Sequence, residues 1–364
     1  MILTVVSFLL VMSVVVFVHE LGHFLVAKRS GIVVEEFGFG FPPRLIKLGE
    51  RKGTVYSLNA IPFGGFVRMR GEDDPSLPGS FASASKRARA LTLVAGATMN
   101  FLLAIVLLAV LTAITGVPDD SRPGTLIKGI AAGSPAEQAG LQIGDRIVAA
   151  DGTPLASVND LQRYTAGHTG RSVTYEIVRR DPSGSEMTLQ VTMTPRTNPP
   201  SQQGALGIQI DIPTRPPKIW EAVWSGVKAT GEVIYLTFQI PATLIREGRP
   251  ISDAGFMGPV GIAATTGDVV RSAVAVSSAS PVLWFVGLLS IALGVTNLLP
   301  IPGLDGGRLL FVFVEAVRRK RIEPSQEGVV HLVGFGLLLL LVGIITVREV
   351  TALVNGTFPT LGIH

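Results

Sequence analysis

Two histidines and a glutamate near the N-terminus have the spacing of a metal site. The run His19-Glu20-Leu21-Gly22-His23 fits the pattern H-E-x-x-H. On a helix, residues four positions apart lie on one face, so both imidazoles can reach one ion. The intervening Glu20 can act as general base toward a water at the metal. The motif therefore predicts that His19 and His23 bind a metal and that Glu20 is catalytic.

The surroundings of this motif make an accidental cluster unfavourable. Residues 1–18, which precede it, are mostly apolar and carry no charged side chain. An ionisable residue within a membrane span costs on the order of 3 kcal/mol, so the group needs a metal ion or a polar cavity to offset that cost. The chain has no cysteine, so the metal must be bound by His, Asp or Glu.

A catalytic zinc usually has three protein ligands and one open position for water. Asp305 is the candidate for the third ligand, because it follows a Pro/Gly break at residues 300–303 that can turn the backbone toward the first apolar segment. A turn or helix-cap aspartate is the alternative. Zinc is the expected metal, although a site of two histidines and one carboxylate can also hold iron.

Four apolar segments must position these residues. Hydrophobic residues make up 47% of the chain and charged residues 16%, and the mean hydropathy is +0.47. These values are typical of a membrane protein. About 20 apolar residues are needed to cross the hydrocarbon core as a helix. We therefore predict a polytopic α-helical membrane protein with four transmembrane helices, at 1–27, 90–116, 281–299 and 329–347.

Basic residues predict the orientation of these helices. Lys28–Arg89 contains 11 Lys or Arg residues, and positions 318–321 are all basic. Both loops lie on one side under a four-span model, and the positive-inside rule makes that side cytoplasmic. We expect a protein of the inner or plasma membrane with both termini and residues 117–280 outside. The active site would lie near the cytoplasmic side. The first apolar segment is expected to be retained, because it has no basic start and no small-residue cleavage site.

The loops have their own predicted structure. Residues 28–89 are rich in Gly, Pro and short β-prone runs, which predicts β-hairpins that associate with or re-enter the membrane. Residues 117–200 predict a compact α+β domain, with strands at 172–178 and 187–193 and a helix at 158–166. The remaining segments are a proline-rich linker with an amphipathic helix (201–280), a motif and cytoplasmic loop (300–328) and a C-terminal tail (348–364). The helix, at 219–238, lies either on the outer membrane face or on the soluble domain.

The motifs together resemble the site-2 protease family of intramembrane zinc metalloproteases, specifically the bacterial members with a PDZ domain. The family pairs H-E-x-x-H with N-x-x-P-x-P-x-L-D-G near the end of its third core span. Every fixed position of that second motif is present, as Asn297, Pro300, Pro302, Leu304, Asp305 and Gly306. Pro62-Phe63-Gly64-Gly65-Phe66-Val67 in the hairpin region and Gly258-Pro259-Val260-Gly261 also match. The resemblance covers nearly the whole chain.

The resemblance implies a role for each motif residue. His19, His23 and Asp305 would bind Zn²⁺, with Glu20 as general base. Asn297 would contact the substrate backbone or steady the tetrahedral oxyanion. The hairpins, with Gly64 and Gly65, would pair with an unwound substrate segment. Where the family often has Gly-Pro-x-x-Asn-Phe, this chain has Gly96-Ala97-Thr98-Met99-Asn100-Phe101, and Asn100 either makes a polar packing contact or helps to hold the substrate.

The outer segment resembles one extracytoplasmic PDZ domain of α+β structure. The matching residues are Gly133-Ser134-Pro135-Ala136, Ala139-Gly140-Leu141, Gly144-Asp145-Arg146-Ile147 and Asp151-Gly152. PDZ grooves bind an extended chain end by adding a strand to a sheet edge. The domain would either bind a peptide in this way or exclude bulky ectodomains as a steric gate.

The family resemblance implies an enzyme that cuts the transmembrane segments of single-span proteins already trimmed outside the membrane. Such substrates are anti-sigma factors or remnant signal peptides, cut in regulated intramembrane proteolysis within the lipid bilayer. The oligomeric state stays open. No basic stretch is interleaved with aromatic residues, so no nucleic-acid partner is expected.

Two other classes of protein are alternatives. A catalytically silent scaffold that binds peptide ends through its PDZ domain would not need Glu20. A zinc transporter would need paired metal sites along a path, and segments 90–116 and 329–347 contain no acidic or metal-binding cluster. His331, His168 and His364 are single histidines that we do not expect to bind metal.

Overall fold

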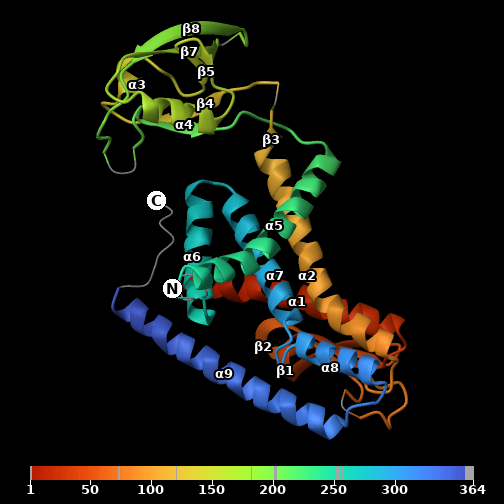
Figure 1. The fold of residues 1–364 in the computed structure, drawn as a ribbon. Coiled ribbons are helices and arrows are strands. Elements are labelled where there is room, and N and C mark those ends of the chain that lie inside the picture. Colours follow the sequence, from red (N-terminus) through yellow and green to blue (C-terminus); the bar gives the residue numbers. More distant parts are fainter. Residues whose placement is uncertain are drawn as a thin grey trace. The chain divides into compact units, whose positions relative to one another are not determined.

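A computed structural model describes residues 2–356 apart from residues 73, 120, 182, 201–202, 251–254 and 256. The chain divides into two compact units. The helical unit contains the residues up to Ile114 and from Ile219 onward, and the β unit contains Thr115–Lys218. Figure 1 labels most of the helices and strands of both units.

Four helices of the helical unit are long and apolar enough to cross a membrane. Each coincides with one of the four predicted segments, so the prediction of a polytopic membrane protein with four apolar spans is confirmed. The helices at the first, second and fourth segments extend several residues beyond the predicted bounds, because their polar ends continue past the apolar run, whereas the helix at 281–299 is shifted by one residue. The four helices are α1 (Ile2–Arg29), α2 (Lys86–Thr115), α7 (Ser280–Leu298) and α9 (Pro324–Val354).

Glycine allows α1 and α2 to approach closely. A Cβ added to Gly22 would lie 2.3 Å from the carbonyl oxygen of Ala95. Small residues at such contacts let helix backbones come together in a membrane, where van der Waals packing replaces the hydrophobic effect as the source of association. Buried residues of α1, α2 and α7 form two further clusters: Val11, Val15 and Val286, and Ala104, Leu108, Ile291 and Val295.

The predicted hairpin region is one hairpin of two long, bent strands, β1 (Val34–Arg51) and β2 (Thr54–Met69). Each strand pairs with two parts of the other, because Phe37 lies opposite both Val67 and Tyr56. The first half of β1 is therefore flanked on both sides, and the last residues of β2 form an edge of the sheet. This edge lies against α1, where a Cβ on Gly64 would lie 2.4 Å from Val16.

Three further helices belong to the helical unit, and the sequence predicted only part of them. α5 (Ile219–Arg246) is longer than the predicted helix, and α6 (Pro259–Ala275) and α8 (Asp305–Arg318) lie where linker and loop were expected. α6 begins with proline at its first position, and α8 has an acid in its first turn and a base in its last. These are ordinary end signals of helices, but the glycines around them obscure the pattern.

α5 contacts two of the long apolar helices. Ala229, Val233 and Ile234 of this helix pack on the cluster formed by α2 and α7. Residues from Ile219 onward belong to the helical unit. Part of the apolar face of this helix is therefore covered by α2 and α7, whereas Trp220, Val223 and Trp224 of the same helix are exposed.

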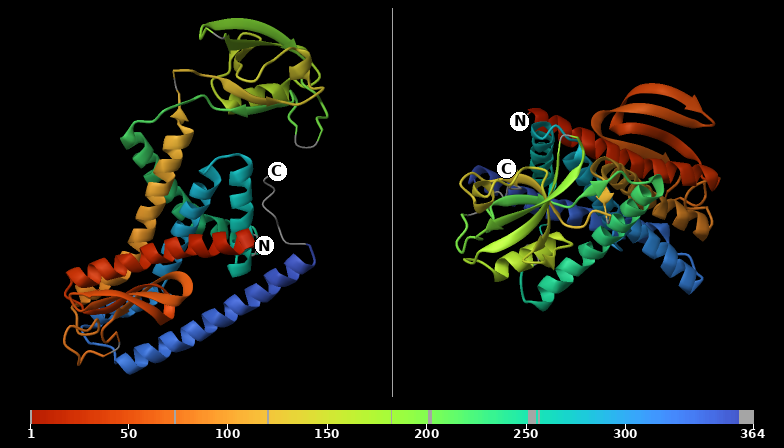
Figure 2. Two further views of the ribbon diagram at one scale, coloured as in Figure 1. Left: turned by 180° about the vertical axis from the view of Figure 1, so that it is seen from behind. Right: turned by 90° about the horizontal axis from the view of Figure 1, so that it is seen from above.

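The β unit is an antiparallel sheet with two short helices, seen from two further directions in Figure 2. The strand order is β8-β7-β5-β4-β9, with β6 paired to β5, and β3 pairs separately with β10. The predicted strands at 172–178 and 187–193 and the helix at 158–166 are confirmed as β7, β8 and α4. Tyr175, Ile147 and Ile177 are fully buried in its core. The elements are β3 (Val117–Pro118), β4 (Thr125–Ile130), α3 (Pro135–Gln138), β5 (Arg146–Ala150), β6 (Thr153–Pro154), α4 (Val158–Gly167), β7 (Val173–Arg180), β8 (Glu186–Met193), β9 (Ile208–Asp211) and β10 (Thr214–Arg215).

The contact between α1 and α2 can be tested with one methyl group. Gly22→Ala should lower the free energy of unfolding by about 1–3 kcal/mol, because the added carbon overlaps backbone that cannot rotate away. Gly343→Ala in α9 is the control, since a Cβ there has no neighbour within 4 Å. Thermal unfolding in detergent would compare the two, and equal stability of both variants would contradict the close contact.

Candidate metal centre

Three side-chain atoms from distant parts of the sequence converge at one point. The Nε2 atoms of His19 and His23 lie 3.1 Å apart, and each lies 3.1 Å from Oδ2 of Asp305. A tetrahedral zinc site with bonds of about 2.0 Å separates its ligand atoms by roughly 3.3 Å. The three atoms therefore have the spacing that one zinc ion requires, and both histidines are 5% exposed.

The elements that present these atoms follow from the local sequence. α1 carries both histidines one turn apart on the same face. Asp305 is the first residue of α8, directly after the Pro/Gly turn that ends α7. That turn is tight, because a Cβ on Gly306 would lie 2.1 Å from the carbonyl oxygen of Leu299. The predicted break in the chain thus brings the carboxylate to the histidines.

Both imidazoles are held from behind by α2. Nδ1 of His23 donates a hydrogen bond to the carbonyl oxygen of Thr92 at 2.8 Å, and Nδ1 of His19 lies 3.3 Å from the side-chain amide nitrogen of Asn100. With that amide turned by 180°, its buried oxygen, which has no other partner in the described structure, accepts from Nδ1–H. Such contacts leave Nε2 of each ring for a metal.

Asn100 therefore contacts a candidate metal ligand. Its side chain is completely buried, and the residue does not line the cavity in front of the histidines. This position agrees with the polar packing contact that the sequence left open. The missing proline of the family pattern at residue 97 leaves the contact of Asn100 with His19 intact.

Gly96 completes the support. A Cβ at this position would lie 2.4 Å from Nε2 of His23 and 2.7 Å from Nε2 of His19. Any side chain here would therefore occupy the space in which the two rings converge. The sequence motif contains this glycine, but its contact with the histidines becomes visible only in the folded chain.

A cavity of about 280 Å³ opens in front of the three converging atoms. Glu20 and Asn297 line it, and the side-chain amide of Asn297 donates to the carbonyl oxygen of Leu293 in its own helix at 3.0 Å. Gly64 and Gly65 do not line it. Gly65 instead packs on the side chain of Glu20, which a Cβ would approach to 3.1 Å. The cavity is lined by His19, Glu20, His23, Val67, Met69, Glu72, Leu93, Asn297, Gly303, Leu304, Asp305 and Arg308.

Two charged lining residues were not identified from the sequence. Arg308 lies one turn after Asp305 in α8, and its guanidinium donates to Glu72 at 2.7 Å. This ion pair joins α8 to the segment that follows β2. The three-residue spacing from Asp305 would have indicated Arg308, had α8 been predicted as a helix.

The electrostatics favour an ionised Asp305. Burial raises the pKa of its carboxyl group, but hydrogen bonds with His19 and His23 outweigh burial and hold the pKa well below its usual range. The position at the first residue of α8 also favours a negative charge, because the helix dipole is positive there. The carboxylate is therefore in the charge state that a metal ligand needs.

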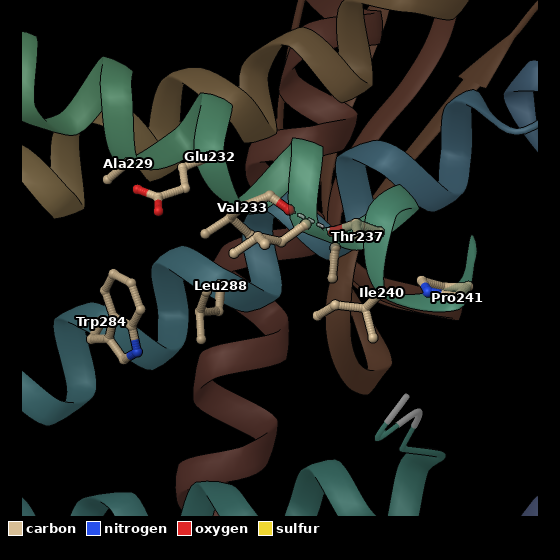
Figure 3. A pocket seen from close by; sticks show the side chains of 10 residues that line it. Ala229, Glu232, Val233, Thr237, Ile240, Pro241, Trp284 and Leu288 are labelled. Atoms are coloured by element: carbon tan, nitrogen blue, oxygen red, sulfur yellow. Dashed lines mark hydrogen bonds between the residues drawn. The ribbon is translucent and has the colours of Figure 1, made fainter. Parts of the chain in front are cut away.

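A larger cavity of about 480 Å³ lies elsewhere, between α5 and α7 (Figure 3). Its lining is mostly apolar, with Glu232 as the one acidic side chain among the lining residues. It contains none of the histidines of the metal centre. The larger cavity is therefore not the candidate site, because the side chains that could bind a metal line the smaller, more polar cavity.

The fold and the centre define a membrane protein with a metal site of the hydrolase type. A model of peptidase family M50 matches residues 7–341, and the chain belongs to this family, which is the site-2 protease family of zinc metalloproteases. It is similar to a putative zinc metalloprotease of Agrobacterium fabrum (34% identical over 382 residues, covering 96% of each chain). It is also similar to the zinc metalloprotease RasP of Geobacillus kaustophilus (28% identical over 430 residues, 95% of this chain and 97% of the relative). The enzyme class is therefore a zinc metalloprotease, and Zn²⁺ is the expected cofactor.

Substitution of Gly96 tests the convergence of the two imidazoles. Gly96→Ala should weaken zinc binding by about 10- to 100-fold, the usual effect of disturbing a group that supports metal ligands. Thr98→Ala, at an exposed position of the same helix, should leave it unchanged. Zinc affinity would be measured by competition with a chelator in detergent. Equal affinities of the two variants would show that the rings do not meet beside residue 96.

Proposed function

We propose that this chain is an intramembrane protease that hydrolyses peptide bonds within the transmembrane segments of single-span proteins already trimmed outside the membrane. One observation carries the proposal. The atoms of His19, His23 and Asp305 converge beside Glu20, inside a unit built from helices apolar enough to span a membrane. Anti-sigma factors and remnant signal peptides are the substrate classes that the proposal names, and it assigns the enzyme to regulated intramembrane proteolysis.

In this proposal His19, His23 and Asp305 hold the zinc, and the other residues handle protons and substrate. Zinc, when bound, acts as a Lewis acid on the scissile carbonyl and acidifies water. The carboxylate of Glu20 accepts a proton from the attacking water and delivers it to the leaving nitrogen. Asn297, at the cavity wall, contacts the substrate backbone or steadies the oxyanion.

A transmembrane substrate must unwind before cleavage, because a helix engages its carbonyls in its own hydrogen bonds. The edge of β2 is the surface on which we place the unwound segment. Gly65 of this edge packs on Glu20, and Val67 and Met69 line the cavity. In the described part of the chain β2 pairs with β1 alone. A substrate added as a further strand would run past the metal centre in extended form.

We further propose that the β unit is a PDZ domain outside the membrane. Its support is the five-stranded antiparallel path with two helices, together with the Gly133-Ser134-Pro135-Ala136 motif at the start of α3. The domain either binds a peptide end or excludes untrimmed ectodomains. In this proposal the metal centre lies near the cytoplasmic side of the inner or plasma membrane and both termini lie outside, which the positions of the basic loops support. A lipid bilayer and single-span substrates are the partners, and the oligomeric state is left open.

Glu20→Gln is the decisive variant for the reaction. The amide cannot accept the proton of the attacking water, so cleavage of a model single-span substrate with a trimmed ectodomain should fall below detection. Zinc content should stay at the wild-type level, because Glu20 is not one of the converging ligands. Purified protein in detergent would be assayed for both quantities.

Glu232→Gln provides a matched control, because it removes a carboxylate from the second cavity of the same unit. This variant should cleave at the wild-type rate. Wild-type cleavage by Glu20→Gln would remove the general base from the proposal. Bound zinc without cleavage by the wild-type enzyme, on trimmed substrates of several sequences, would favour a scaffold.

A further inference from the structure

The turn that presents Asp305 is held by a histidine of α9. Nδ1 of His331 accepts a hydrogen bond from the backbone N–H of Gly303 at 2.9 Å, two residues before Asp305. The side chain of His331 is only 13% exposed. Its ring centroid lies 5.3 Å from that of Phe311 in α8. One side chain therefore contacts both the turn and the helix that Asp305 begins.

Glycines bring the backbone of α9 against the same turn. A Cβ on Gly334 would lie 2.3 Å from Cβ of Pro302. Gly303 has φ +97°, a conformation that side chains disfavour, and its added Cβ would lie 3.2 Å from backbone atoms of Phe335. The close contact between α9 and the turn therefore requires a glycine on each side, Gly334 in α9 and Gly303 in the turn.

Within the turn, the N–H of Leu304 donates to the carbonyl oxygen of Ile301 at 3.2 Å, and the N–H of Gly303 is the donor that α9 accepts. Leu304 is the N-cap of α8 and supplies no side-chain hydrogen bond to the first turn of the helix. The N–H of Gly303 lies outside any helix, and a backbone donor left without a partner costs free energy. The acceptor on α9 therefore fixes the backbone just where its direction determines the position of the Asp305 carboxylate.

We propose that His331 is a positioning residue for the metal centre, which acts through Gly303 on Asp305 and does not touch the metal. The inference rests on the proposed function, in which Asp305 is a zinc ligand. It assigns to α9, otherwise largely exposed, a direct part in the geometry of the centre. It also explains a histidine that the metal site itself does not use.

Three substitutions of His331 separate the hydrogen bond from simple packing. In His331→Asn the side-chain oxygen takes the place of Nδ1, so the acceptor for Gly303 is kept. In His331→Gln the amide reaches the place of Nε2, and in His331→Phe an aromatic ring remains with no acceptor. Leu332→Ala is the control, because Leu332 is 71% exposed on the next position of the same helix.

The full-length chain in detergent would be titrated with Zn²⁺ against a chelator, and Co²⁺ would replace zinc to report ligand geometry by its visible absorption. We expect His331→Gln and His331→Phe to weaken zinc binding by about 10- to 100-fold and to change the cobalt spectrum. His331→Asn and Leu332→Ala should behave like wild type. Thermal unfolding would be recorded for every variant.

Two results would overturn the positioning role. One is wild-type affinity and an unchanged cobalt spectrum in both His331→Gln and His331→Phe. The other is an equal loss of affinity in His331→Asn, since that variant keeps the acceptor. If His331→Phe does not fold, the zinc affinities and cobalt spectra of His331→Asn and His331→Gln still show whether the hydrogen-bond acceptor matters. Failure of the wild-type chain to bind zinc would instead refute the proposed metal centre itself.

Discussion

The close approach of α1 to α2 is the interaction on which the metal centre depends. Gly22 lets the backbone of α1 reach Ala95, and Gly96 leaves room for the two imidazoles. Because lipid offers helices no hydrophobic driving force toward one another, such close packing supplies much of their association. The same contact places Thr92 and Asn100 behind the histidines. The contacts that pack α1 against α2 thus also orient the imidazoles of His19 and His23.

The third ligand reaches the histidines by a different route. Asp305 stands at the start of α8, after a turn in which glycines lie against the backbone, and α9 contacts that turn from the other side. Few rotatable bonds lie between this turn and the carboxylate of Asp305, so the position of the turn largely determines where the carboxylate lies. The edge of β2 then closes the cavity beside Glu20. Elements distant in sequence therefore define a small polar space within an apolar unit.

Much of this arrangement could be predicted from the sequence, because its signals are local. The four apolar segments, strands β7 and β8 of the β unit and the spacing of His19 and His23 follow from hydropathy, alternation and helix periodicity. The prediction that Asp305 joins the histidines required the second motif and the membrane side expected from the basic loops. α6 and α8 were missed, because glycine-rich and mixed sequences hide short helices beside long apolar ones. The contacts of Arg308 with Glu72 and of His331 with Gly303 join residues far apart in the chain. No local sequence pattern predicts such contacts.

X-ray absorption spectroscopy at the zinc edge, on the full-length chain purified in lipid nanodiscs, would show whether His19, His23 and Asp305 bind one zinc ion together. The account predicts about one zinc per chain, with two imidazole nitrogens and at least one carboxylate oxygen at distances of about 2.0–2.2 Å. Asp305→Ala should remove an oxygen neighbour and keep both imidazoles. A chain without bound zinc, or a zinc whose neighbours are unchanged in Asp305→Ala, would contradict the account.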